Sequence, residues 1–209
     1  MAAPPETPKS APRFGVMALV LAGLLVIAAG TLLTLAVRSN PNGAAGSLFA
    51  SAIGGPFHLI DQNAKPFSDA DLKGKWHLIF FGYSNCQDTC PLVLNEMALA
   101  LDRLGKARDE VAIVFITTDP ERDTPAVLKS YVANFAAPII ALTGSAEAVN
   151  EAEKAYRVYS AKHPLPDGGY DMDHSAVIYL MDPQGRAATT LSPDAPAQAI
   201  ADRLEKLLS

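Results

Sequence analysis

The sequence predicts an α/β domain with helices on the faces of a central mixed β-sheet, preceded by a long apolar segment near the N-terminus. Two compact apolar runs, 76–83 and 111–116, are typical of buried central strands. Between them, residues 91–106 place apolar side chains at every third or fourth position, which predicts an amphipathic helix. Strand, helix and strand in this order indicate a sheet with helices packed against it.

The N-terminal apolar segment, 14–37, carries no charge and predicts a transmembrane helix. A helix of this length rises about 36 Å, enough to cross a hydrocarbon core about 30 Å thick. A cleaved signal peptide is the alternative, but its apolar region spans only about 7–15 residues. Lys9 and Arg13 precede the segment. They predict that residues 1–13 stay in the cytoplasm and that the remainder is exported.

Residues 38–50, rich in Ser, Asn, Gly and Ala, predict a flexible tether, so the working domain is expected to span 51–209. Its first element is a short strand over 56–60. The later elements are predicted from apolar pattern, capping residues and turn residues. They are helices over 124–135, 145–159 and 195–208, strands over 138–142, 175–181 and 186–191, a Pro- and Gly-rich loop over 163–170, and a turn over 182–185.

The charge balance excludes a nucleic-acid-binding protein. The chain has 17 basic and 22 acidic residues, with no run of like charges longer than two. Nucleic-acid binding needs clustered Lys and Arg, so no nucleic-acid partner is expected. Hydrophobic residues make up 49% of the chain, which also excludes a disordered protein.

The chain contains only two cysteines, Cys86 and Cys90, and they lie between strand 76–83 and helix 91–106. This is the carboxyl end of the sheet, where open α/β folds place their sites. Pro91 favours a helix start at or just after Cys90. Backbone N–H groups and the helix dipole at such a position stabilise a thiolate, which is the form that binds metal or attacks a disulfide.

Three interpretations of this cysteine pair compete. A structural disulfide would close so short a loop that it removes little entropy from the unfolded chain. A redox pair usually has two residues between its cysteines, whereas three intervene here. A soft-metal site would suit Cu(I) or Zn(II). Since structural zinc takes four ligands, two sulfurs with one added nitrogen would suit copper better.

Four histidines could supply that nitrogen. His58 and His77 lie in or beside apolar strands and are expected to pack there, and His163 is expected to be solvated in a loop. His174 follows the flexible loop and directly precedes strand 175–181. A histidine at such a position is more often structural than catalytic, so the residues alone leave the choice open.

Three segments give the chain a resemblance to a known family. They are GYSNCQDTCP (82–91), TTDPERDTP (117–125) and DHSAVIYLMDPQGR (173–186). In order and spacing they are similar to the Sco/SenC proteins, and the similarity covers most of 55–209. These are membrane-tethered, thioredoxin-like copper proteins that help to assemble cytochrome c oxidase. The resemblance therefore implies a thioredoxin-like fold for the domain after the transmembrane helix.

The resemblance also implies a metal site and a function. In the family, the two motif cysteines and the histidine before the late strand bind copper, and they correspond to Cys86, Cys90 and His174. The implied ligand is Cu(I) or Cu(II). The implied function is a metallochaperone that delivers copper to, or prepares, the dinuclear copper site of a respiratory cytochrome c oxidase. In this interpretation no residue is catalytic.

The implied partners are the copper-receiving oxidase subunit and either another periplasmic copper donor or a thiol reductant. The implied location is the inner (cytoplasmic) membrane, with the C-terminal domain in the periplasm. Asn85 and Gln87 depart from the commonest family pattern, which has histidine and proline there. Neither position is a family ligand, so the metal assignment is unaffected.

One alternative function uses the same thiols. A membrane-anchored thiol–disulfide reductase would use Cys86 and Cys90 as a redox pair to reduce the cysteines of an oxidase subunit before metalation. His174 discriminates between the two functions, because a dithiol reductase needs no imidazole ligand. A peroxide-reducing relative is a third possibility, but no convincing Thr and Arg set surrounds Cys86.

Residues near the predicted site have weaker assignments. Met172 precedes His174 by two positions and is either a soft ligand or, more simply, a packing residue. The charged residues after strand 111–116 are expected to form a rim that orients the site or contacts a partner, or to serve in capping and ion pairs. These residues are Asp119, Glu121, Arg122 and Asp123.

Overall fold

The computed structural model describes residues 53–166 and 168–208 and, before them, Leu24 alone. The predicted cytoplasmic, transmembrane and tether segments, 1–13, 14–37 and 38–50, lie outside the described residues except for Leu24. Within the described part of the chain, no helix is both long and apolar enough to cross a membrane. All the elements described here belong to the second of two units in the chain, Leu48–Ser209.

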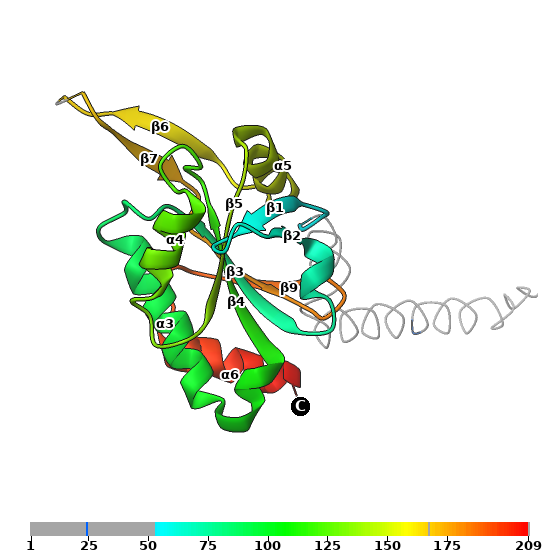
Figure 1. Ribbon diagram of the computed structural model, residues 1–209. Helices are drawn as coiled ribbons and strands as arrows, with labels where there is room; N and C mark the ends of the chain where they lie inside the picture. Colours follow the sequence, from blue (N-terminus) through cyan, green and yellow to red (C-terminus); the bar gives the residue numbers. More distant parts are fainter. Residues whose placement is uncertain (1–23, 25–52, 167, 209) are drawn as a thin grey trace, which may run out of the picture. The chain divides into compact units, whose positions relative to one another are not determined.

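A seven-stranded sheet forms the centre of this unit, in the order β2-β1-β5-β4-β3-β8-β9 (Figure 1). The central pairs β3–β4 and β4–β5 are parallel, whereas β1–β2, β1–β5, β3–β8 and β8–β9 are antiparallel. The predicted mixed sheet is therefore confirmed. Its strands are β1 (His58–Asp61), β2 (Pro66–Ser68), β3 (Trp76–Gly82), β4 (Val111–Thr117), β5 (Ile139–Thr143), β8 (Ile178–Met181) and β9 (Ala187–Leu191).

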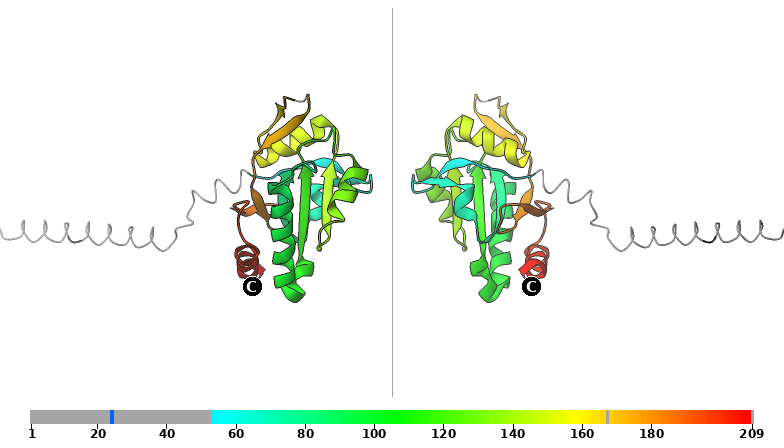
Figure 2. Two further views of the ribbon diagram at one scale, coloured as in Figure 1. Left: turned by 90° about the vertical axis from the view of Figure 1, so that its left-hand side faces the viewer. Right: turned by 90° about the vertical axis from the view of Figure 1, so that its right-hand side faces the viewer.

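Four α-helices and two short 3₁₀-helices surround the sheet in the described residues. α3 lies along the central strands in both views of Figure 2. The bounds are α3 (Thr89–Arg103), α4 (Pro125–Val132), α5 (Ala146–Tyr156), α6 (Ala197–Leu208), η1 (Asp69–Leu72) and η2 (Gly105–Glu110).

The packing of strand β3 explains why its sequence is a continuous apolar run. Leu78 and Phe80 pack into the core beneath α3, α4 and α6, whereas Ile79 and Phe81 pack into the second core beneath α5. Alternate side chains point to opposite faces of a strand, so a strand covered on both faces needs apolar residues at every position. Helices therefore cover both faces of the central sheet.

The predicted cap, Thr124, begins α4. The Val127 N–H donates to the Thr124 hydroxyl oxygen at 3.4 Å, and Pro125 occupies the first helical position of α4. α4 ends at Val132 rather than at 135, as turns and bends follow it. α5 ends at Tyr156, because the next residue, Arg157, adopts a left-handed conformation with φ 57°.

The predicted loop 163–170 is wrong over part of its length. The residues on either side of its tip form a separate two-stranded antiparallel hairpin, β6 (Ser160–Pro164) and β7 (Tyr170–His174), which extends beyond the body of the unit at the upper left of Figure 1. Strand β8 begins at Ile178, so the predicted start at 175 is also wrong. The hairpin was missed because β6 (SAKHP) carries no apolar alternation and is held mainly by backbone pairing.

Candidate metal centre

The end of β3 and the start of α3 position the two thiols. Cys86 lies in the connecting loop, and its N–H donates to the Tyr83 carbonyl at 3.2 Å to close a turn. Cys90 is the second residue of α3, which begins at Thr89, one residue before the start that Pro91 predicted. Cys90 is 0% exposed, whereas Cys86 is only partly buried. One thiol therefore belongs to the core and the other to the rim of the site.

The two thiols contact each other without forming a disulfide. Both are free, and the Cys90 N–H donates to Cys86 Sγ at 3.4 Å. A hydrogen bond from the Cys90 thiol, aided by nearby backbone N–H groups and opposed by burial, lowers the pKa of Cys86 to about 5. The same hydrogen bond, together with burial, raises the pKa of Cys90. Cys86 is therefore the thiolate of the pair at neutral pH.

His174, the last residue of β7, brings an imidazole to the buried thiol. Its Nε2 lies 3.8 Å from Cys90 Sγ. Its Nδ1 lies 3.2 Å from the Ser175 carbonyl oxygen, and since a carbonyl only accepts, we assign the proton to Nδ1. The lone pair of Nε2 then faces the sulfur. Phe80 and Tyr83 meet the imidazole edge-on, with ring centroids 6.2 and 5.8 Å away.

The spacing of Cys90 and His174 fits two ligands of one ion. Bonds of about 2.3 Å to sulfur and about 2.0 Å to nitrogen, at about 120° to each other, place the two donor atoms about 3.7 Å apart. Among the described residues, however, no group of three His, Cys, Asp or Glu side chains is already arranged to hold a metal ion.

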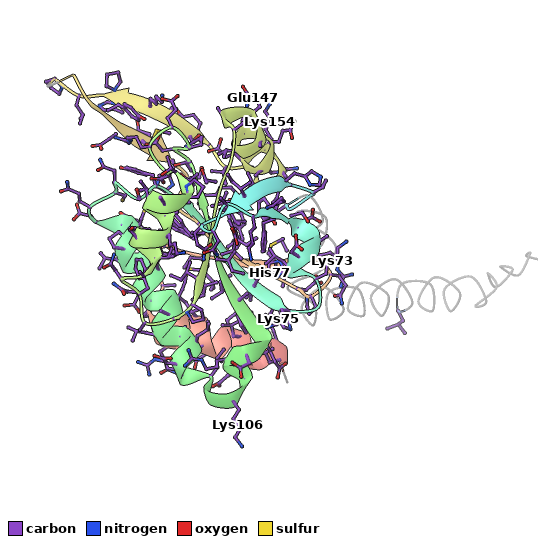
Figure 3. The ribbon with its side chains drawn as sticks, viewed as in Figure 1. Lys73, Lys75, His77, Lys106, Glu147 and Lys154 are labelled. Atoms are coloured by element: carbon purple, nitrogen blue, oxygen red, sulfur yellow. The ribbon has the colours of Figure 1, made fainter. Side chains whose placement is uncertain are left out.

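The other three histidines lie away from this arrangement. His77 is buried in β3, its Nδ1 is 3.0 Å from the Lys75 carbonyl oxygen, and burial lowers its pKa. Figure 3 shows His77 and Lys75 far from the β6–β7 hairpin. His58 is exposed in β1, and His163 is exposed on β6 beside Asp173.

Met172 is 8% exposed and packs in the same core cluster as Cys90. Because it lies two positions before His174 on β7, it shares that residue's face of the strand. Its place in the cluster accords with the packing role.

Two of the four charged residues that were predicted to form a rim around the site are buried. Asp119 and Asp123 are 1% and 0% exposed. Asp123 accepts hydrogen bonds from the Ser84 N–H at 3.0 Å, from the Ser84 hydroxyl, and from the Thr117 hydroxyl at 2.6 Å. Glu121 remains at the surface, where it pairs with Lys162. The buried carboxylates therefore hold the loops around the site, and only part of the cluster faces solvent.

Two residues that shape the site were not singled out from the sequence. A Cβ on Gly82 would lie 2.8 Å from Cys90 Sγ, so glycine is required for the close approach of β3 to this thiol. Tyr170 donates its hydroxyl to Asp119 at 2.9 Å and links the hairpin to the β4–α4 loop. Gly82, the first residue of the cysteine segment 82–91, was an available signal, whereas no local pattern marks Tyr170.

Comparisons with known proteins agree with this arrangement. The sequence profile of the SCO1/SenC family matches residues 45–209. The mitochondrial protein SCO1 of Saccharomyces cerevisiae is 44% identical over 143 residues, which cover 67% of this chain and 48% of the yeast protein. This chain thus spans about half the length of that relative.

Two solved structures extend the likeness to three dimensions. ScoI of Bradyrhizobium japonicum, solved with copper bound, is 45% identical with a TM-score of 0.70, over 74% of this chain and 99% of that chain. BsSco, a member of the Sco family of cytochrome c oxidase assembly proteins with an identified disulfide switch, is 27% identical with a TM-score of 0.60, over 75% and 93% of the two chains. The predicted thioredoxin-like fold is confirmed.

Proposed function

The chain belongs to the SCO1/SenC family, and from that premise we propose that it binds copper for cytochrome c oxidase assembly through the thiolates of Cys86 and Cys90 and the imidazole of His174. The single observation that carries this ligand set is the 3.8 Å approach of His174 Nε2 to Cys90 Sγ. The two residues are 84 positions apart in the sequence, so the fold itself brings them together.

The donor set suits copper as a cargo. Thiolates prefer soft Cu(I), and imidazole serves copper in both oxidation states. Cys86 supplies a thiolate at neutral pH, whereas the Cys90 thiol, whose pKa hydrogen bonding and burial raise, must release its proton when the metal binds. With Cu(II), an oxygen ligand or water would join the three side chains. Loss of a thiolate removes both charge and soft-ligand character, so it costs more affinity than loss of the imidazole.

The cellular setting completes the proposal. Segment 14–37 anchors the chain in the inner membrane, segment 38–50 tethers the domain, and the domain works in the periplasm. There it delivers copper to the copper-receiving subunit of a respiratory oxidase, after loading by another copper donor or reduction by a thiol reductant. The apolar, uncharged composition of 14–37 supports the anchor.

A second candidate function follows from the difference in burial and pKa between the two thiols. Cys86 is a partly exposed thiolate beside a buried, protonated Cys90. In a thiol–disulfide reductase, the Cys86 thiolate would attack a partner disulfide, and Cys90 would resolve the mixed disulfide after losing its proton. Two electrons would pass from the dithiol to the partner, which leaves Cys86 and Cys90 joined as a disulfide.

Copper titration of the full chain in detergent tests the ligand set. We expect thiolate-to-copper charge-transfer absorption in the wild type and its loss in Cys86→Ser and Cys90→Ser. His174→Ala should weaken binding at least about 10-fold, more for Cu(II) than for Cu(I). Unchanged spectra in the cysteine variants would refute the proposal. The reductase would be favoured instead if the chain bound no copper and if His174→Ala reduced disulfides as fast as the wild type.

A further inference from the structure

The loop between β4 and α4, residues 118–124, contacts both halves of the site. It runs from the end of β4, next to β3, to the start of α4. Two of its carboxylates, Asp119 and Asp123, are almost completely buried. Burying a carboxylate is costly unless hydrogen bonds or an opposite charge compensate it. The partners of these two acids therefore show which segments the loop is built to hold.

Asp123 holds the thiol loop. Its carboxylate accepts from the Ser84 N–H at 3.0 Å and from the Ser84 hydroxyl, two residues before Cys86. The Thr117 hydroxyl donates to the same carboxylate at 2.6 Å, which ties it to the end of β4. The loop that carries Cys86 is thereby fastened to the sheet.

Asp119 and Arg122 hold the hairpin that carries His174. The Arg122 Nε donates to Asp119, and the Tyr170 hydroxyl donates to Asp119 at 2.9 Å. The Arg122 NH1 also donates to the Tyr170 carbonyl at 2.8 Å, and the guanidinium carbon lies 3.9 Å from the centroid of the Tyr170 ring. Tyr170 is thus held by its backbone, its hydroxyl and its ring at once.

Tyr170 and His174 are the two ends of one five-residue strand, β7. Among the strands that the structure describes, it pairs with β6 alone, outside the seven-stranded sheet. The backbone ladder of the central sheet therefore does not include His174. Its position depends on the packing of the imidazole against Phe80 and Tyr83, on the burial of Met172, and on the side-chain contacts that attach the far end of β7 to the β4–α4 loop. The exposed ion pair of Lys162 with Glu121 is a weak attachment by comparison, since 44% and 62% of these side chains are exposed.

Resting on the proposed function, we propose that Arg122 is a positioning residue that, through Tyr170, sets the distance between the imidazole of His174 and the thiols. The guanidinium donates through separate nitrogens to Asp119 and to the backbone of β7 while stacking on the Tyr170 ring. Lysine keeps the charge but cannot make two directed hydrogen bonds and a planar stack together. Arg122→Lys therefore separates geometry from charge.

Copper binding by Arg122→Lys in the full chain tests the proposal. We expect Cu(II) affinity to fall roughly 10-fold, and nitrogen hyperfine coupling in the Cu(II) electron paramagnetic resonance spectrum to weaken. Cu(I) affinity should change less, since both thiolates remain in place. Tyr170→Phe, which removes only the hydroxyl bond to Asp119, should shift the same signals in the same direction by a smaller factor. This milder variant keeps the test valid if Arg122→Lys folds poorly.

A double-mutant comparison distinguishes positioning from general destabilisation. In a His174→Ala background, Arg122→Lys should produce no further loss of copper affinity, because the imidazole that it positions is absent. His163→Gln, an exposed change on β6, is the matched control and should leave the spectrum unchanged. Additive losses in the double variant, or unchanged nitrogen coupling in Arg122→Lys, would overturn the role of Arg122. If Cys86→Ser bound copper with the affinity of the wild type, the proposed function would be overturned instead.

Discussion

The two halves of the candidate site are built in opposite ways. Cys90 lies at 0% exposure between β3 and α3, surrounded by the larger of the two apolar cores. His174 lies at the end of a hairpin in which Lys162, His163 and Pro164 are all exposed. The first half is held by the apolar core around Cys90 and by the hydrogen bonds of Ser84 to Asp123. The second half reaches the same core through Met172 alone among its buried residues and depends more on hydrogen bonds to the β4–α4 loop.

This difference assigns different tasks to the two halves. Segments with dense apolar burial open only at a cost near that of global unfolding, whereas exposed hairpins open locally at a much lower cost. We therefore expect the thiol half to remain constant during copper uptake and release, and the imidazole half to move. The proposed delivery of copper would use such an arrangement, because release requires at least one ligand to leave the metal ion.

The largest effect is expected from a change that disrupts the buried half. In Gly82→Ala, the new Cβ would lie 2.8 Å from Cys90 Sγ and 3.0 Å from the Phe115 ring, so buried groups must shift. We expect the free energy of unfolding to fall by about 1–3 kcal/mol. Displacement of the thiol should also weaken copper binding at least about 10-fold. Denaturant unfolding and copper titration measure the two effects.

Gly144→Ala is the matched control for this prediction. Its Cβ would lie 3.1 Å from Leu59 Cδ2, on the face of the sheet away from the thiols, and a flexible side chain can adjust. Copper affinity should therefore stay at the wild-type value. If Gly82→Ala also kept wild-type affinity, the close approach of β3 to Cys90 would have no bearing on the site.

The second effect concerns the hairpin half. His174→Ala should leave the stability of the copper-free protein within about 0.5 kcal/mol of the wild type, since the residue is only partly buried. The rise in melting temperature on adding Cu(II) should shrink strongly, because stabilisation by a ligand follows its affinity. Differential scanning calorimetry with and without Cu(II) measures both values. A large loss of stability without copper would show that His174 is part of the rigid framework.

The third effect compares the two thiols directly. Since hydrogen bonding lowers the pKa of Cys86 to about 5, its alkylation by iodoacetamide should be nearly constant from about pH 8 to about pH 6 and should halve near pH 5. Cys90 should react only after unfolding, because its sulfur is buried. Peptide mass spectrometry over a pH series measures each rate. The thiolate assignment fails if the rate at Cys86 still climbs between about pH 7 and about pH 8.5.

The smallest effect lies at the base of the hairpin, where Glu153 of α5 hydrogen-bonds Ser160, the first residue of β6. Burial raises the pKa of Glu153, so the folded protein holds this proton more tightly than the unfolded chain. Stability should therefore fall as pH rises from the unfolded pKa to the folded one, and stay lower above it. Glu153→Gln should remove that slope.

Denaturant unfolding between about pH 4 and about pH 8 measures the slope. The matched control is Glu151→Gln, an exposed position on the same helix, which should leave the slope in place. Equal slopes in the wild type and Glu153→Gln would contradict the assignment of the slope to this carboxyl group.

The sequence predicted most elements of the central sheet because their signals are local. The apolar runs of β3 and β4, and the Thr–Pro start of α4, follow from burial and capping within a few residues. The hairpin β6–β7 was missed because β6 carries no apolar alternation and β7 was assigned in part to a Pro- and Gly-rich loop. As a result, the strand that carries His174 was not predicted.

For the site, the sequence by itself determined the chemistry of the two thiols. A cysteine at the start of a helix, with a second four positions earlier, predicts thiolate chemistry in this segment. The expectation that the helix start itself lowers the pKa of Cys90 is wrong, because the hydrogen bond to Cys86 and burial raise it, and the thiolate is Cys86. The residues alone left the choice of histidine open, and the family resemblance indicated His174. Only the tertiary structure places its imidazole beside the buried sulfur, because the two meet through the packing of a hairpin on a distant loop. It also decided that Asp119, Arg122 and Tyr170 form one hydrogen-bonded group, since contacts between segments far apart in the chain leave no local pattern in the sequence.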